Sequence, residues 1–280
     1  MDYVDPNIGT AHCRWFFYTP AAIPFGMAKL APSTDAHLGN PGGWQAVGYD
    51  FRHTSIEGFA NFHEFQVGGV VFAPTVGELQ TVPGELENPD GGYRSRFDKK
   101  DEVAAPGYYS VLLKDYGVKA ELTAMKRVGF HRYTYPKTEQ ANLIFDIGNK
   151  QGESGEVKDA EVQYFEDGRV EGYVITSPVY VNIYQKGADV RMYFSAVLNK
   201  KPVQVGTFVK DVVNPGKHQE KDQARVLHDI LYRRTRGCGS QSGPILYFHR
   251  ECSFQPGNRA ADVTFDQAKK NATDVWNESL

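Results

Sequence analysis

Carboxylates in the first third of the sequence have the plainest potential chemistry, because paired carboxyl groups hydrolyse glycosidic bonds. An inverting hydrolysis needs two such groups roughly 6.5–9.5 Å apart, one protonated and the other a base that activates water. Four carboxylates lie in this loop-rich part of the chain: Asp35, Asp50, Glu57 and Glu64. A self-sufficient hydrolase would need a pair of these carboxylates within the chain, but this density is ordinary for a globular protein. We therefore expect no catalytic residue in this chain.

The same region carries residue types that bind sugars. A pyranose ring needs an aromatic face against its apolar side and planar polar groups for its adjacent hydroxyls. Eight residues of these types occur here: His12, Arg14, Trp15, Trp44, Asn61, His63, Glu64 and Gln66. Taken alone, they leave two interpretations open. Either the group forms a sugar site, or Trp15 and Phe62 are core residues and the others are solvated loop residues.

Metal-binding and nucleophilic chemistry find less support in the sequence. His12, His63 and Glu64 have ligand side chains, but they show neither an i, i+4 pair nor a His-x-His spacing. Cys13 has no identifiable base partner and is predicted to be a packed thiol. Three cysteines in the chain form neither a disulfide framework nor a zinc motif. We therefore expect no metal ion in this chain.

Short strands separated by turn residues are predicted to position these side chains. Val118–Ala124 alternates between apolar and polar residues and forms a hairpin with Tyr108–Leu113. Val162–Phe165 and Val170–Ile175 flank Asp167-Gly168, which is typical of a second hairpin. Many short strands without intervening helices predict an all-β fold, a large antiparallel β-sandwich or supersandwich.

Charge and hydropathy exclude several classes of partner. The chain has 31 Lys and Arg against 34 Asp and Glu, a net charge of −3. This balance gives no electrostatic signature of nucleic acid or membrane binding. No run approaches the roughly 18 apolar residues of a spanning helix. Met1–Thr10 has neither a basic leader nor an apolar stretch, so no signal peptide is predicted.

The end of the chain predicts one amphipathic helix. Thr264-Phe265-Asp266-Gln267 has the form of a capping box. Apolar residues then follow a helical period: Phe265, Ala268, Ala272, Val275, Trp276 and Leu280. Because nothing follows this apolar face in the sequence, we expect it to require a partner from outside the chain.

Residues 224–260 differ from the rest in composition. They hold six Arg and no Lys, whereas residues 1–223 hold 15 Lys and eight Arg. One interpretation is an exposed basic loop, although 37 structureless residues are unusual in a compact domain. We favour a frame-shifted translation, because codons can be chosen that let residues 239–252 read as an alternating strand in the next frame. As written, only Pro244–Phe248 resembles a strand, and Pro244 restricts its pairing. The predicted divisions are a sandwich domain over 1–223, this segment, and the start of a helix over 261–280.

Eight short motifs follow one another over the first half of the chain. They are Tyr3-Val4-Asp5-Pro6-Asn7-Ile8-Gly9-Thr10, Pro24-Phe25-Gly26-Met27, Gly48-Tyr49, Ile56-Glu57-Gly58-Phe59, Pro74-Thr75-Val76-Gly77, Tyr93-Arg94-Ser95-Arg96-Phe97, Ala105-Pro106-Gly107-Tyr108-Tyr109-Ser110-Val111 and Ala120-Glu121-Leu122-Thr123-Ala124. In this order and spacing they resemble the N-terminal domain of glycoside hydrolase family 92, the calcium-dependent exo-α-mannosidases. Two stretches depart from the family pattern, Ala11–Pro20 and Gly58–Glu64. They indicate a divergent subgroup.

The resemblance implies a β-sandwich joined by a helical linker to an (α/α)6 barrel. In the family, that barrel supplies the general acid, the general base and most of the calcium site. The chain would then be a non-catalytic, carbohydrate-binding accessory domain whose partners are a mannose-containing glycan and its own catalytic domain, which this chain lacks. The resemblance places the loops at the cleft between the domains, which favours substrate roles for Trp44, His63 and Glu64. It also implies a periplasmic or extracellular parent enzyme. A free-standing carbohydrate-binding module is the alternative.

Overall fold

The fold is built from two antiparallel sheets that pack face to face. The computed structural model describes residues 4–11, 19–34, 48–61, 70–149, 155–209, 212–216, 218–222, 245–249 and 263–280. The predicted all-β class is confirmed, and helices are few in these ranges. None of the helices in them is long and apolar enough to cross a membrane.

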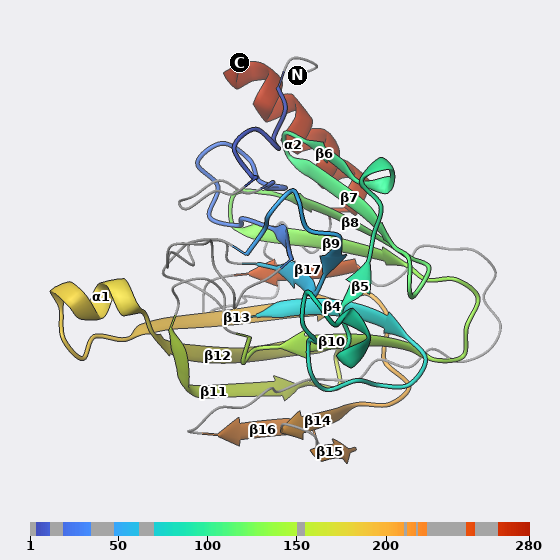
Figure 1. The fold of residues 1–280 in the computed structure, drawn as a ribbon, viewed down its shortest axis with the longest axis vertical. Coiled ribbons are helices and arrows are strands. Elements are labelled where there is room, and N and C mark those ends of the chain that lie inside the picture. The colour runs from blue at the N-terminus through green and yellow to red at the C-terminus, as the bar shows by residue number, and fades with distance from the viewer. Residues whose placement is uncertain are drawn as a thin grey trace.

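The larger sheet has nine strands among the described residues, in the order β16-β11-β12-β13-β17-β9-β8-β7-β6. Figure 1 shows them crossing the molecule from β16 at one end to β6 at the other. Their bounds are β6 Val103–Ala105, β7 Tyr108–Leu113, β8 Val118–Ala124, β9 Val128–Thr134, β11 Glu156–Tyr164, β12 Arg169–Ser177, β13 Val190–Leu198, β16 Gln219–Asp222 and β17 Ile245–His249. Both predicted hairpins are confirmed, β7 with β8 and β11 with β12. Gly117 and Gly168 supply the positive φ angles of their turns.

The smaller sheet has the order β1-β3-β4-β10 in the described part of the chain. Its strands are β1 Ala31–Ser33, β3 Gly58–Ala60, β4 Val71–Val76 and β10 Ala141–Asp146. Two short ribbons accompany it, β2 Ser55–Ile56 with β5 Ser95–Arg96, and β14 Gly206–Val209 with β15 Val212–Pro215. Two single 3₁₀ turns occupy Pro89–Gly91 and Lys99–Asp101.

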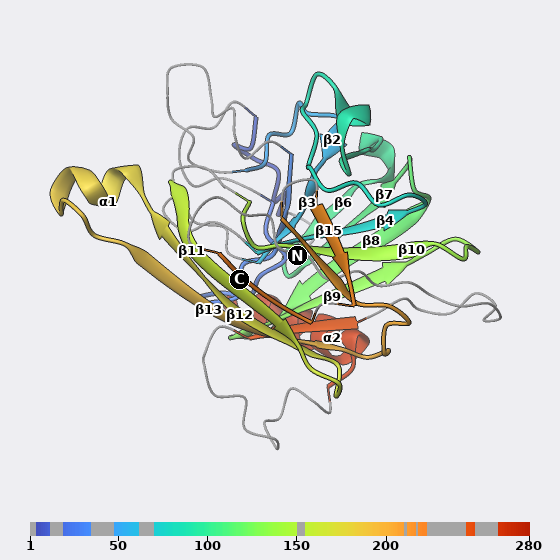
Figure 2. The ribbon, with the colours of Figure 1, turned by 90° about the horizontal axis from the view of Figure 1, so that it is seen from below.

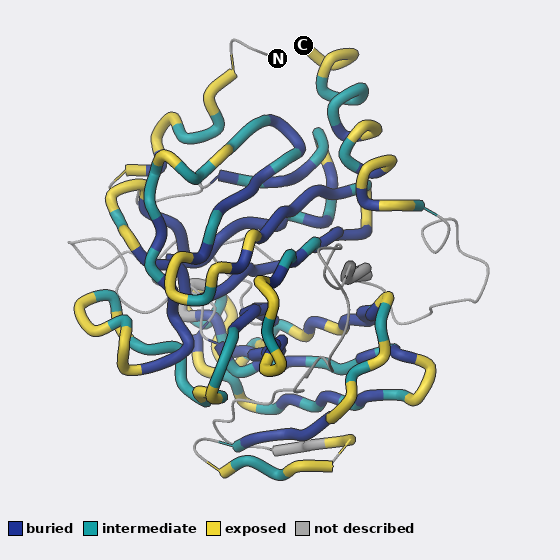
Figure 3. The backbone as a smooth tube through the Cα atoms, turned by 90° about the vertical axis from the view of Figure 1, so that its right-hand side faces the viewer, coloured by how far each residue is buried: buried dark blue, intermediate teal, exposed yellow. Residues whose placement is uncertain are grey.

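The main hydrophobic core lies between the two sheets. Phe59 of β3 contacts Tyr133 of β9 with ring centroids 5.8 Å apart, and Phe72 of β4 lies 5.0 Å from the ring of His131. Leu122 and Val162 belong to the same buried cluster. Figure 3 shows the strands of both layers mostly buried and the turns mostly exposed. Apolar residues on the inner faces of the two sheets therefore hold the layers together.

Two helices lie outside the sheets. Helix α1, Val179–Tyr184, lies between β12 and β13 and projects from the side of the molecule in Figures 1 and 2. Helix α2, Phe265–Ser279, confirms the predicted terminal helix. Its capping box is formed as expected, with Thr264 Oγ1 accepting from Gln267 N at 3.2 Å.

The first half of the apolar face of α2 has a partner within the chain, contrary to the expectation, whereas Leu280 at its end is exposed. Phe265, Ala268 and Ala272 are buried, and α2 lies against β7, β8 and β9. Phe265 and Ala268 form a separate cluster with Val128 and Phe130. These strands carry apolar residues on both faces, so the large sheet has an outer apolar surface that the helix covers. This partnership links segments more than a hundred residues apart, and a helical period cannot reveal it.

Strand β17 lies at the one stretch of residues 224–260 that the sequence indicated as strand-like. Ile245–His249 pairs with β13 on one side and β9 on the other, in registers that include Phe248 with Ala196 and Leu246 with His131. The stretch with strand-like character is therefore an interior strand, because a run of β-forming residues without internal proline can pair on both edges. Residues 223–244 and 250–262 lie outside the described residues, and the frame-shift interpretation stays a prediction.

Candidate functional site: buried polar clusters at the loop stems

One of the eight predicted sugar-binding residues, Asn61, lies within the described ranges. The other seven lie outside the described residues: His12, Arg14, Trp15, Trp44, His63, Glu64 and Gln66. Asp50 and Glu57 are described, whereas Asp35 also falls outside. The structure describes the residues that flank two of these segments: Thr34 and Gly48 around segment 35–47, and Asn61 and Val70 around segment 62–69.

Asn61 is fully buried and joins the two ends of segment 62–69. Its Nδ2 donates to the carbonyl of Val70 at 2.9 Å, so its Oδ1 is the acceptor that faces His131 Nε2 at 2.7 Å. His131 Nε2 must then carry the ring hydrogen, and Nδ1 accepts from the Tyr133 hydroxyl at 2.8 Å. Burial lowers the pKa of His131 to about 3, which keeps the ring neutral. The Asn61 amide thus connects the two described residues on either side of segment 62–69.

Thr34 joins the two ends of segment 35–47 in a similar way. Its backbone N–H donates to the carbonyl of Gly48 at 2.6 Å. Its hydroxyl accepts from the backbone N–H of Asp50 at 2.9 Å and lies 2.9 Å from His53 Nδ1. Thr34, which precedes the segment, is therefore bonded directly to Gly48, which follows it.

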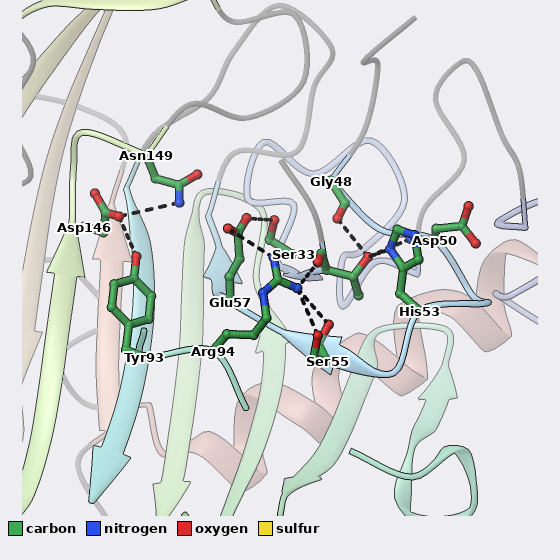
Figure 4. A network of polar contacts seen from close by, with 11 residues as sticks. Ser33, Gly48, Asp50, His53, Ser55, Glu57, Tyr93, Arg94, Asp146 and Asn149 are labelled. Carbon is green, nitrogen blue, oxygen red and sulfur yellow. Dashed lines mark hydrogen bonds and ion pairs between the residues drawn. The ribbon is translucent and has the colours of Figure 1, made fainter. Parts of the chain in front are cut away.

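A buried ion pair between Glu57 and Arg94 contacts Ser33 and Thr34, the residues that precede segment 35–47. Glu57 Oε1 accepts from the Ser33 hydroxyl at 2.5 Å, and Glu57 Oε2 lies 3.8 Å from Arg94 Nη2. Arg94 Nη1 donates to the carbonyl of Thr34, and it lies 3.3 Å from the carbonyl and 3.2 Å from the hydroxyl of Ser55. Figure 4 shows the guanidinium between Glu57 and Ser55. The two side chains are 0% and 1% exposed, so each charge depends on the other for compensation.

A second buried carboxylate lies at the end of β10. Asp146 Oδ2 accepts from the Tyr93 hydroxyl at 2.5 Å and from Asn149 Nδ2 at 3.5 Å, and Oδ1 accepts from Gly148 N at 3.1 Å. Burial raises the pKa of Asp146 to about 7, and the negative charge of Glu57 acts in the same direction. Asn149 is the last residue described before segment 150–154 (Figure 4).

The described carboxylates near these segments are bound by other residues of the chain. Glu57 and Asp146 are buried, and each is bound by neighbouring side chains. Asp50 is held by Arg52, with nitrogen–oxygen distances of 2.9 and 2.6 Å. Within the described ranges, no three His, Cys, Asp or Glu side chains gather as metal ligands would. These side chains therefore do not fit a calcium ion.

Sequence reasoning missed the residues that build these clusters, above all Tyr93, Arg94 and Asp146. The only signal for the first two was the family-like motif Tyr93–Phe97, in which they are neighbours. Asp146 lies within the apolar run Leu143–Ile147, which predicts a buried segment but does not show which partner its carboxyl group has. Their partners lie 53 residues away for Tyr93 and 60 residues away for Arg94.

Comparison with known proteins adds an independent line of observation. A family model described as the glycosyl hydrolase family 92 N-terminal domain matches residues 3–272. None of the curated protein sequences matches the chain at a significant level.

Three solved structures extend the comparison. The family GH92 α-mannosidase BT3965 from Bacteroides thetaiotaomicron superposes with a TM-score of 0.83 at 26% identity, covering 99% of this chain and 37% of that one. Its complex with mannoimidazole gives a TM-score of 0.81 at 25% identity and covers 99% and 36%. The inverting mannosidase BT2199 from the same species has a TM-score of 0.71 at 17% identity, covers 99% and 35%, and shows a shared fold alone.

The sheets, the terminal helix and the family match agree with one another and confirm the resemblance found in the motifs. The chain spans little more than a third of the length of the mannosidases to which it is similar. It belongs to the glycosyl hydrolase family 92 N-terminal domains.

Proposed function

We propose that the chain is the accessory, substrate-binding domain of an exo-acting α-mannosidase and performs no hydrolysis itself. One observation carries this proposal: 99% of the chain matches only 37% of an α-mannosidase chain, at 26% identity. The parent would be an inverting, calcium-dependent enzyme in the periplasm or outside the cell, with its acid, base and calcium ligands in the part that this chain does not match.

The described carboxylates are bound by other residues of the chain, which supports a non-catalytic role for this domain. A general acid or base must reach the substrate or an attacking water. Glu57 and Asp146 are buried under other side chains, and Asp50 is bound by Arg52. We therefore expect no release of mannose from an α-mannoside by the purified chain, with or without calcium. Release above that of a matched Glu64→Ala variant would contradict this.

Substrate contact is assigned to the loop residues predicted from the sequence. We propose that Trp44, His63 and Glu64 contact the sugar, together with His12, Arg14, Trp15 and Gln66. The buried clusters at Thr34 and Asn61 support this, because they fix the residues from which the loops with Trp44, His63 and Glu64 begin. The proposed ligand is a mannose-containing glycan, as the mannoimidazole complex of a relative suggests.

Binding is expected to be weak, because a partial pocket buries little of a sugar. A titration with methyl α-mannoside, followed by NMR, should give millimolar affinity that Trp44→Ala abolishes. Tyr184→Ala removes an exposed aromatic ring from α1 and serves as the control. Failure of the wild-type chain to bind would contradict the substrate role.

A free-standing carbohydrate-binding module is the second candidate. It is favoured by the position of α2, because Phe265, Ala268 and Ala272 on its apolar face are buried against the domain's own sheet. A self-contained module needs a closed surface of this kind. Micromolar affinity for a mannoside in calorimetry would favour this candidate over the accessory domain.

A further inference from the structure

Tyr93 and Arg94 are consecutive residues that bind two different buried carboxylates. The Tyr93 hydroxyl donates to Asp146, and the Arg94 guanidinium lies against Glu57. Figure 4 shows the two pairs side by side. Asp146 ends β10, near segment 150–154, whereas Glu57 precedes β3 and binds the last residue of β1. One dipeptide therefore connects the two outer strands of the smaller sheet, β10 through Asp146 and β1 through Glu57 and Ser33.

The backbone of this dipeptide is fixed independently of its side chains. Tyr93 N donates to the carbonyl of Val82 at 2.8 Å, and Arg94 N donates to the carbonyl of Pro83 at 3.0 Å. Gly92, just before it, packs so closely that a Cβ atom there would lie 2.3 Å from Gly84 N. The residues that follow pair as β5 with β2. The side chains of Tyr93 and Arg94 thus extend from a rigid support.

A fully buried ion pair is a poor source of stability, because removing two charges from water costs about as much as their attraction returns. Glu57 Oε2 and Arg94 Nε also make no hydrogen bond with the described residues. What the arginine does provide is geometry. Its planar fork reaches the carbonyls of Thr34 and Ser55 and the Glu57 carboxylate at once, which a lysine ammonium cannot reproduce.

We propose that Arg94, paired with Glu57, is a positioning residue that fixes Thr34 and with it the start of segment 35–47, which carries Trp44. This inference rests on the proposed function, since Trp44 is there a sugar contact. Arg94 itself touches no substrate. It acts through the Thr34 carbonyl, while Thr34 holds Gly48 at the other end of the segment.

The decisive variant is the double substitution Glu57→Gln with Arg94→Gln. It removes both charges together, so neither is left buried without compensation, and the glutamine at position 94 is too short to reach all three acceptors. Arg96→Gln is the matched control, because Arg96 is an exposed neighbour whose ion pairs with Asp90 and Asp115 lie at the surface.

Each variant is measured by thermal unfolding and by NMR titration with methyl α-mannoside. We expect the double variant to unfold cooperatively and to bind the mannoside at least tenfold more weakly than wild type. Arg96→Gln should match wild type in affinity. Unchanged affinity in the double variant, beside a binding wild type, overturns the inference and leaves the proposed function standing.

Hydrogen exchange gives a second readout that does not depend on sugar binding. Peptides covering residues 34–48 should exchange at least tenfold faster in the double variant than in wild type or Arg96→Gln, while peptides from β7 and β8 should not change. Equal exchange in residues 34–48 overturns the inference. If the wild type binds no mannoside but the exchange rates differ as expected, the proposed function fails and the positioning role of Arg94 holds.

Discussion

Phe25 occupies a backbone conformation that a bulky side chain rarely adopts. Its φ is +56°, its ring is fully exposed, and its turn is closed by Gly26 N donating to the carbonyl of Ile23 at 3.0 Å. A left-handed backbone costs a residue of this type about 1 kcal/mol, and asparagine tolerates it better. Phe25→Asn is therefore expected to raise the melting temperature by about 2–4 °C in calorimetry.

The control for this substitution is Ile8→Asn. Ile8 is also an exposed apolar residue, but it is not among the residues with positive φ. Its replacement should leave the melting temperature unchanged. A melting temperature below that of wild type for Phe25→Asn would show that the ring makes a stabilising contact.

Asp146 is expected to make the domain less stable as the pH rises. Burial raises its pKa from 3.8 to about 7, so between these values the folded state holds a proton that the unfolded state releases. This stabilising contribution is fully present below pH 4 and is lost as the pH rises through 7. Asp146→Asn removes the titration, so its stability relative to wild type should increase by up to about 1.4 kcal/mol per pH unit over this range.

Urea unfolding at several pH values between 4 and 8 tests this expectation. Asp189→Asn is the control, because Asp189 is a partly exposed carboxylate that pairs with Lys158. An Asp146→Asn difference that stays constant from pH 4 to pH 8 would contradict a buried, proton-binding carboxyl group.

At the scale of elements, the docking of α2 depends on Gly107, just before β7. Gly107 has a φ of +79°, and a Cβ atom there would lie 2.8 Å from Ala272 Cβ and 3.2 Å from Trp276 Cδ1. The Trp276 indole also donates to the carbonyl of Ala22 at 2.8 Å, which ties the helix to the N-terminal part of the chain. Gly107→Ala should therefore push the helix away from the sheet.

Gly117→Ala separates this contact from backbone strain. Gly117 has a φ of +62°, but a Cβ atom there would meet its nearest neighbour, Pro136, at 3.6 Å. Both substitutions introduce alanine at positive φ, and only Gly107→Ala adds a clash with α2. We expect Gly107→Ala to be less stable than Gly117→Ala by about 1–3 kcal/mol in urea unfolding. Equal losses would mean that the helix is not held at this point.

At the scale of the whole molecule, the frame-shift prediction for residues 224–260 concerns the completion of the large sheet. Strand β17 fills the position between β13 and β9, while the frame-shift interpretation predicts that a longer alternating strand belonged there. A frame-repaired chain, with residues 239–251 replaced by Ala-Val-Lys-Val-Gly-Leu-Ser-Tyr-Thr-Ser-Ile-Glu-Asn, is therefore expected to melt at a higher temperature.

Limited trypsin digestion adds a second measurement for the same pair of chains. Cleavage after Arg233, Arg234 and Arg236 should be fast in the chain as written, because three arginines in four residues cannot enter a core without burying charge. If the chain as written melts as high as the repaired chain and also resists cleavage at these sites, the frame-shift interpretation is wrong.

The sequence by itself determined the elements whose signals are local. Asp115-Tyr116-Gly117 and Asp167-Gly168 specify hairpins because glycine adopts positive φ at little cost. Thr264 and Gln267 specify the start of α2 because they satisfy two backbone donors three residues apart. The all-β class and the family followed from such signals and from the order of short motifs.

Only the tertiary structure decided which distant segments meet. The placement of β17 between β13 and β9, the covering of α2 by β7–β9, and the contact of Arg94 with Thr34 all join residues far apart in the chain. No local pattern encodes these pairings, because they depend on how apolar faces and buried charges are satisfied together when the sheets pack. For this reason the sequence predicted which segments carry the proposed sugar contacts. The contacts of Thr34, Asn61 and Arg94 beside these segments were found only in the tertiary structure.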